Sequence, residues 1–238
     1  MDKRFAVLID ADNVSDKYIK PILDEISNDG VITYKRIYGD WTRPALAPWK
    51  NVLLSHSITP IQQYSYTTGK NATDSAMIID AMDILYSGNV DGFCIVSSDS
   101  DFTRLAARLR ESGMHVIGMG EKKTPKPFIS ACNRFVYLEI LASEENTHKS
   151  EAPDSAEIDA KTVKNAIASI IDEVSDDDGW ASLSEIGNIL LKRYPSFDVR
   201  NFGFQKLTPF IRSLGIFEIY AVASEKGNVR VIYVRRKT

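Results

Sequence analysis

Short apolar runs alternate with amphipathic segments along the first 140 residues of the chain. Residues 5–9 (FAVLI) and 93–96 (FCIV) are apolar throughout and contain β-branched side chains, which is typical of strands buried on both faces of a parallel sheet. After residue 103 the apolar positions recur at helical spacing until Gly113, where a helix is expected to end. The pattern therefore predicts strands that alternate with helices.

The remaining elements of this region follow from the same two periodicities. Strands are predicted at residues 31–38, 58–64, 114–118 and 135–138, and helices at residues 16–28, 44–54, 74–86 and 129–132, with a basic loop at residues 122–127. Alternation at this spacing predicts an α/β fold built on a doubly wound parallel sheet.

The composition changes at Ser143. Residues 143–160 are acidic and polar with almost nothing to bury, so they are predicted to form a flexible linker between a domain at residues 1–142 and a smaller one at residues 161–238. In the second domain the pattern predicts helices at residues 163–174, 183–193 and 200–214, then strands at residues 217–223 and 229–235. Three helices and a terminal hairpin are the outline of a winged helix.

Bulk composition narrows the function classes only slightly. The net charge of −3 does not indicate a nucleic-acid binder, but it does not exclude one, because aspartates gathered at a metal site lower the total. The two cysteines and three histidines lack zinc-site spacing. Without a signal peptide or an apolar run long enough to span a membrane, the protein is expected to be cytoplasmic.

Aspartates follow the two most apolar strands. Asp10 and Asp12 come directly after the first, Asp99 and Asp101 after the other, and Asp74 lies where a helix begins. Carboxyl ends of parallel strands share one edge of a sheet, where α/β folds bind ligands, and clustered carboxylates suit Mg²⁺ or Mn²⁺. The simpler alternative, that Asp10 and Asp99 only cap helices, explains one such residue better than five.

Four motifs carry a resemblance to a known family. In order, they are IDADN (9–13), YGDW (38–41), GKNATD (69–74) and SSDSDF (97–102). Together they resemble the NYN domain, a PIN-like nuclease family that includes the bacterial LabA-type proteins. The resemblance implies a PIN-like sheet and metal-dependent cleavage of RNA. It carries a catalytic role to Asp10, Asn13, Asp74, Asp99 and Asp101, with Asp10, Asp74, Asp99 and Asp101 as ligands of Mg²⁺ or Mn²⁺.

The second domain resembles the OST-HTH, or LOTUS, winged helix. The match lies in WASL (180–183), Gly187, Tyr194-Pro195, Phe197, Phe204, Lys206-Leu207 and Leu214. It implies RNA binding or, as in some relatives, a protein partner. Basic residues that could contact RNA are Lys70, Lys122 and Lys123 in the first domain and Arg200, Lys206, Arg230 and Arg235 in the second. The alternative for such charges is a solvated surface.

The function predicted from these features is a metal-dependent ribonuclease with a C-terminal RNA-binding module. A non-catalytic RNA-binding adaptor is the main alternative. A haloacid-dehalogenase-like phosphatase is a weaker one: Asp10-Ala11-Asp12 fits its outline, but Asn13-Val14 stand where that pattern has Gly-Thr. The RNA target, the mode of cleavage and the oligomeric state stay open.

Overall fold

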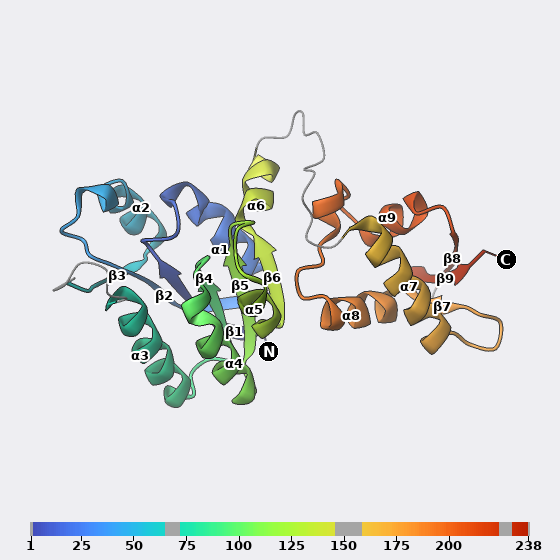
Figure 1. Ribbon diagram of the computed structural model, residues 1–238, viewed down its shortest axis with the longest axis horizontal. Helices are drawn as coiled ribbons and strands as arrows, with labels where there is room; N and C mark the ends of the chain where they lie inside the picture. The colour runs from blue at the N-terminus through green and yellow to red at the C-terminus, as the bar shows by residue number, and fades with distance from the viewer. Residues whose placement is uncertain (1, 65–71, 146–158, 224–229, 238) are drawn as a thin grey trace. The chain divides into compact units, whose positions relative to one another are not determined.

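A six-stranded parallel sheet forms the centre of the N-terminal unit (Figure 1). The computed structural model describes residues 2–64, 72–145, 159–223 and 230–237, and the chain divides into two units between Thr147 and His148. The strand order is β3-β2-β1-β4-β5-β6. Their bounds are β1 (Lys3–Asp10), β2 (Gly30–Gly39), β3 (Thr59–Gln62), β4 (Gly92–Val96), β5 (His115–Gly120) and β6 (Arg134–Tyr137).

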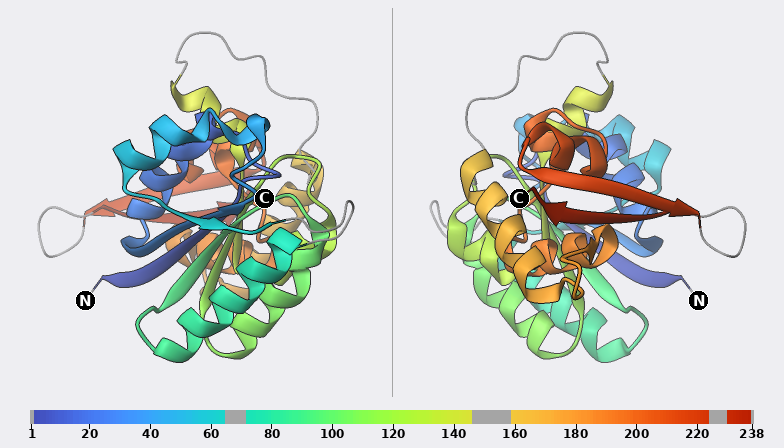
Figure 2. Two further views of the ribbon diagram at one scale, coloured as in Figure 1. Left: turned by 90° about the vertical axis from the view of Figure 1, so that its left-hand side faces the viewer. Right: turned by 90° about the vertical axis from the view of Figure 1, so that its right-hand side faces the viewer.

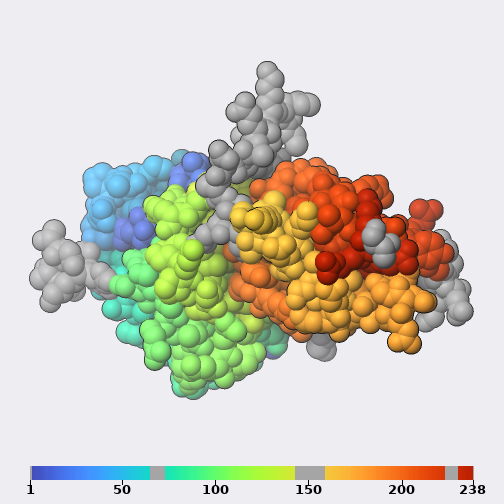
Figure 3. Space-filling model, turned by 45° about the vertical axis from the view of Figure 1, so that its right-hand side comes forward, coloured from blue at the N-terminus to red at the C-terminus, as the bar shows by residue number. Residues whose placement is uncertain are grey.

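Helices cover both faces of this sheet (Figure 2). One face carries α1 (Ile19–Ser27), α2 (Trp49–His56) and α6 (Leu138–Glu145), and the other carries α3 (Ala72–Ser87), α4 (Thr103–Glu111) and α5 (Lys126–Ala131). Figure 3 shows the outer side of the α4 and α5 layer as a green surface. The predicted α/β class with a doubly wound parallel sheet is confirmed.

The central strand β1 shows why both layers are needed. Phe5, Val7 and Ile9 pack into one hydrophobic core, while Ala6 and Leu8 pack into the other. All five side chains are completely buried, because successive side chains of a strand point to opposite faces. This explains the uninterrupted apolar run, and it places Asp10 at the carboxyl end of a strand in the middle of the sheet.

Helix α6 was missed by the sequence prediction, which ended the last strand at Leu138. The strand ends at Tyr137, and the helix runs from Leu138 through Glu145, so the first three residues expected in the linker are helical. Leu138 and Leu141, three residues apart, both pack into the core against the α1 face. Helix α5 likewise begins at Lys126, within the expected loop, and Pro127 fits its first turn.

The C-terminal unit combines three helices with a small antiparallel sheet in the order β7-β9-β8. The elements are α7 (Ala160–Val174), β7 (Ala181–Ser182), α8 (Leu183–Arg193), α9 (Leu207–Ser213), β8 (Phe217–Ala223) and β9 (Arg230–Arg236). The predicted helix at residues 200–214 is wrong in its first half. A 3-10 turn, η4 (Val199–Phe202), ends at Gly203, whose φ of 78° breaks the helix before α9 begins.

Three predicted segments lie partly or wholly outside the part of the chain that the structure describes. They are residues 69–71 of the GKNATD motif, residues 146–158 of the expected linker, and residues 224–229, which include the first residue of the predicted last strand. None of the helices among the described residues is long and apolar enough to cross a membrane.

Candidate metal centre at the carboxyl edge of the sheet

Asp10 ties together the two strands at the middle of the sheet. It is completely buried at the end of β1. Its Oδ1 accepts a hydrogen bond from the Asp12 backbone N–H (3.0 Å), and its Oδ2 accepts from Asn13 Nδ2 (2.6 Å) and Ser97 Oγ (2.9 Å). Burial raises the pKa of Asp10, and the hydrogen bonds from Asn13 and Ser97 partly oppose that shift. The carboxylate therefore fixes the loop after β1 against the loop after β4.

Two successive hydrogen bonds between residues close in sequence stabilise the loop after β4. Ser97 Oγ accepts from the Asp99 backbone N–H at 3.1 Å, and Asp99 Oδ1 accepts from the Asp101 backbone N–H at 2.9 Å. Asp99 is thus the N-cap of the 3-10 turn η3 (Ser100–Phe102), as the capping interpretation expected. Capping uses one oxygen of Asp99 and sets the direction of its side chain.

Gly120, the last residue of β5, allows the neighbouring backbone to approach this loop. A Cβ atom at this position would lie 2.6 Å from both the Ser97 carbonyl oxygen and Thr124 Oγ1. Both are too close for any side chain. A glycine is therefore required for β5 to reach the edge beside Ser97.

Three of the predicted ligands come together at this edge. One carboxylate oxygen each from Asp74, Asp99 and Asp101 lies within 4.8 Å of the others. Asp74, in the first turn of α3, is buried, Asp99 is half-buried and Asp101 is exposed. Burial and the nearby charges of Asp10 and Asp99 raise the pKa of Asp74 to about 6. Hard oxygen donors with this excess of negative charge fit Mg²⁺ or Mn²⁺.

Asp10 and Asn13, the other two predicted site residues, lie beside this cluster and outside it. Asn13 donates a hydrogen bond to Asp10, and the negative charge of Asp10 contributes to the raised pKa of Asp74. Complete burial of Asp10 also disfavours the phosphatase alternative, because a nucleophilic carboxylate must reach its substrate.

Asp12 joins the cluster to a neighbouring loop, a role the sequence did not reveal. Its Oδ1 accepts from Arg43 Nη1 (2.7 Å), and its Oδ2 accepts from Thr73 Oγ1 (3.1 Å). Thr73 directly precedes Asp74. The position of Asp12, two residues after Asp10, indicated that its side chain lies at the same edge of the sheet. Its pairing with Arg43 could not be predicted, because Arg43 lies 31 residues further along the chain.

The predicted RNA contacts of the N-terminal unit include two lysines after β5. Lys123 Nζ forms an ion pair with Glu121 at 2.7 Å and is exposed, whereas the Lys122 backbone N–H donates to Glu139 Oε1 at 3.0 Å. Lys70 lies outside the described residues.

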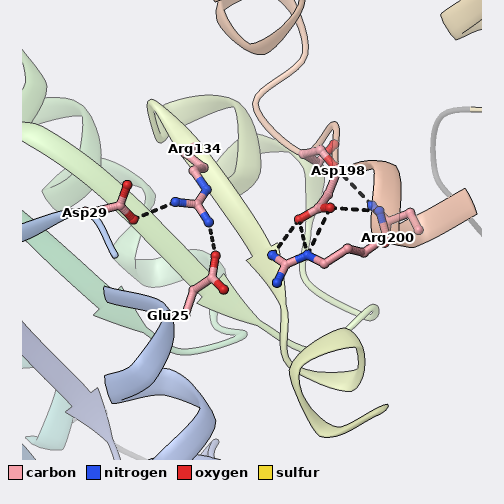
Figure 4. A network of polar contacts seen from close by, with 7 residues as sticks. Glu25, Asp29, Arg134, Asp198 and Arg200 are labelled. Carbon is pink, nitrogen blue, oxygen red and sulfur yellow. Dashed lines mark hydrogen bonds and ion pairs between the residues drawn. The ribbon is translucent and has the colours of Figure 1, made fainter. Parts of the chain in front are cut away.

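In the C-terminal unit, two of the four predicted arginines and lysines are engaged within the protein. The guanidinium of Arg200 donates to Asp198 (Nη2 to Oδ2, 2.6 Å; Figure 4). Arg235 pairs with Glu218 at 2.6 Å, and its guanidinium carbon lies 4.6 Å from the centre of the Trp180 ring. Lys206 and Arg230 are exposed.

Fold and site together define a PIN-like α/β domain with an acidic cluster at the carboxyl edge of its sheet. The model of the NYN domain matches residues 4–139, more than half of the chain, and the chain belongs to this PIN-like nuclease family. The model of the OST-HTH/LOTUS domain, an RNA-binding module, matches residues 158–229. The architecture expected from the sequence motifs is confirmed.

Two solved structures are similar to parts of this chain. A protein of unknown function from Vibrio parahaemolyticus is 18% identical, with a TM-score of 0.48, and the match covers 57% of this chain and 93% of that one. An uncharacterized protein from Nitrosomonas europaea is 25% identical, with a TM-score of 0.31, and the match covers 39% and 83%. A search of curated proteins found no match.

Proposed function

We propose that this protein is a metal-dependent ribonuclease that hydrolyses phosphodiester bonds of RNA at the cluster of Asp74, Asp99 and Asp101. The observation that carries this proposal is the approach of the three carboxylates to within 4.8 Å in a domain of a nuclease family. A bound Mg²⁺ or Mn²⁺ supplies neutralisation of phosphate charge and activation of water. Asp74, Asp99 and Asp101 would hold the ion.

The remaining side chains position these ligands. Asp10 and Ser97 hold the ends of β1 and β4 together, and the Asp101 backbone N–H orients the Asp99 carboxylate. Asp12 binds Thr73 beside Asp74. Asp99 and Asp101 thus come from the turn after β4 and Asp74 from the first turn of α3, and hydrogen bonds of the surrounding residues fix both segments, as a preorganised site requires.

We assign RNA capture to the C-terminal unit, with proposed boundaries of 1–142 for the nuclease domain, 143–160 for the linker and 161–238 for the RNA-binding domain. The outer face of the β8–β9 sheet supports this assignment. Tyr220 is 57% exposed there, 5.8 Å from the Trp180 ring, and Arg235 lies over Trp180. Exposed aromatic rings beside arginine suit stacking of single-stranded bases. The alternative to RNA as the ligand of this unit is a protein partner. We also propose that the protein is located in the cytoplasm.

The test is cleavage of an end-labelled single-stranded RNA by the purified full chain. We expect cleavage with Mn²⁺ or Mg²⁺, none with EDTA, and at least a hundredfold loss in Asp99→Asn, because a ligand that holds the metal supports every step of the displacement. Asp83→Asn, at an exposed position of α3, is the matched control and should keep wild-type activity.

Two results would change the proposal. Equal rates of cleavage by wild type and Asp99→Asn would show that the cluster of Asp74, Asp99 and Asp101 takes no part in the reaction. RNA binding without cleavage under any metal condition would favour the adaptor alternative.

A further inference from the structure

A pocket of about 520 Å³ lies next to the carboxyl edge of the sheet, on the side covered by α2. Its lining includes five charged residues, together with Asn13 and Trp49: Asp12, Asp16, Glu121, Arg43 and Lys123. None of the three clustered aspartates lines it. Its volume falls in the range of small-molecule sites. It is a separate cavity whose rim is shared with the metal centre through Asp12.

Two cations reach this pocket from separate loops. Arg43 follows β2 and Lys123 follows β5, and each is paired with a carboxylate of the same lining, Asp12 and Glu121, at 2.7 Å. The side chains of Arg43 and Lys123 are 54% and 66% exposed, and ion pairs with this exposure contribute little to stability. Either pair can therefore open at small cost in stability. The released cation is then available to a phosphate group, and Asp12 keeps its hydrogen bond from Thr73.

The floor of the pocket has a different character. Ala11, Leu46 and Trp49 line it, and each is at most 7% exposed. An apolar floor with two cations at the opening matches the two halves of a nucleotide, a flat ring and a phosphate.

The connection to the metal centre runs through one side chain. Asp12 accepts from Arg43 with one oxygen and from Thr73 with the other, and Thr73 adjoins Asp74. A strand whose phosphate binds Arg43 therefore lies close to the clustered carboxylates.

We propose that this pocket binds one nucleotide of the RNA strand beside the bond that is cleaved, with Arg43 and Lys123 on the phosphate and the apolar floor against the base. The identification of the strand as a substrate rests on the proposed function, but the pocket's affinity for a nucleotide does not. Arg43 and Lys123 are then substrate-binding residues, and Asp12 is a positioning residue between pocket and metal centre.

Binding of adenosine 5′-monophosphate to the full chain in EDTA tests the proposal, since no metal and no cleavage are involved. Calorimetry gives the affinity, and the backbone amide signals of Asn13, Trp49 and Lys123 give the place. We expect Arg43→Ala and Lys123→Ala each to weaken binding of adenosine 5′-monophosphate about tenfold. Adenosine, which has no phosphate, should bind to the wild-type protein as weakly as adenosine 5′-monophosphate binds to either variant. Arg108→Ala, an exposed arginine on α4, is the matched control and should bind as wild type.

Cleavage kinetics separate this inference from the proposed function. Arg43→Ala should raise KM about tenfold with kcat within twofold, whereas Asp99→Asn should lose kcat and keep its affinity for the nucleotide. Unchanged nucleotide affinity in Arg43→Ala and Lys123→Ala, absence of nucleotide binding, or signal changes away from the pocket would overturn the inference even if the ribonuclease activity stands. Nucleotide binding without any ribonuclease activity would instead contradict the proposed function and leave the nucleotide-binding pocket in place.

Discussion

The acidic side chains at the amino edge of the parallel sheet and the three clustered aspartates at its carboxyl edge differ in their partners. At the amino edge, arginines neutralise them: Arg134 binds Glu25 and also Asp29 (2.6 Å; Figure 4). Arg4 Nε lies 3.2 Å from Asp91 Oδ2. At the carboxyl edge, Asp74, Asp99 and Asp101 have one another as neighbours. No lysine or arginine among the described residues of the N-terminal unit forms an ion pair with Asp74 or Asp99.

This difference separates stability from function within one sheet. Paired acids at the amino edge stabilise the folded chain. At the carboxyl edge, burial and the charges of the neighbouring aspartates raise the pKa of Asp74, and this costs stability, a common property of sites that bind a ligand. Three substitutions sharpen or break this comparison.

The largest effect is expected for Arg134→Ala at the amino edge. Its loss leaves Glu25, 8% exposed, as a buried carboxylate without its arginine. Loss of one partner of a buried pair typically costs about 3–5 kcal/mol, and we expect about 3 kcal/mol here because Arg134 is itself 25% exposed. Urea unfolding monitored by circular dichroism measures it. Adding Glu25→Gln should recover part of the loss, and a change below 1 kcal/mol would show that this edge is not held by its ion pairs.

A smaller effect of opposite sign is expected for Asp74→Asn. The folded-state pKa of Asp74 is about 6, above its ordinary value of 3.8, so the folded chain holds this proton more tightly than the unfolded chain. Stability of the metal-free protein therefore falls as the pH rises from about 4 to 6 and stays reduced above it. A pKa raised from 3.8 to about 6 corresponds to about 3 kcal/mol, and screening by solvent at the edge of the sheet reduces this value. Asp74→Asn should therefore remove that fall and stabilise the metal-free protein at pH 7 by about 2 kcal/mol. Urea unfolding in EDTA from pH 4 to 7 measures this, and an unchanged pH profile would contradict the assignment of strain to Asp74.

The smallest effect is expected for Arg4→Ala. The Arg4 and Asp91 side chains are 49% and 46% exposed, and exposed pairs contribute about 0–1 kcal/mol. We expect a loss of no more than about 0.5 kcal/mol in the same unfolding assay. A loss as large as that of Arg134→Ala would mean that the burial of an ion pair at the amino edge does not determine how much the pair contributes to stability.

Much of the fold follows from the sequence because the signals are local. The apolar runs of β1 and β4 and the aspartates after them place Asp10 and Asp99 at one edge without any knowledge of side-chain contacts. Helix α6 was missed because a short, mostly apolar segment such as residues 137–141 (YLEIL) fits a strand or a helix, and only its packing against α1 decides between them.

Long-range pairs could not be predicted. Asp80 on α3 accepts hydrogen bonds from Arg36 and Tyr38 of β2, more than 40 residues away. The pairing of Asp12 with Arg43 depends in the same way on how two loops meet. The three clustered aspartates were all among the predicted ligands, whereas the pocket beside them has no sequence signature.

The most direct test of the central claim is the rise in melting temperature that Mn²⁺ produces, measured for wild type and Asp99→Asn. A ligand that binds only the folded state raises the melting temperature according to its affinity. We expect a clear rise for wild type, a much smaller one for Asp99→Asn, and a variant at least as stable as wild type in EDTA. A variant that is less stable in EDTA but keeps the full Mn²⁺ response would show that Asp99 is only a helix cap and would contradict the metal centre.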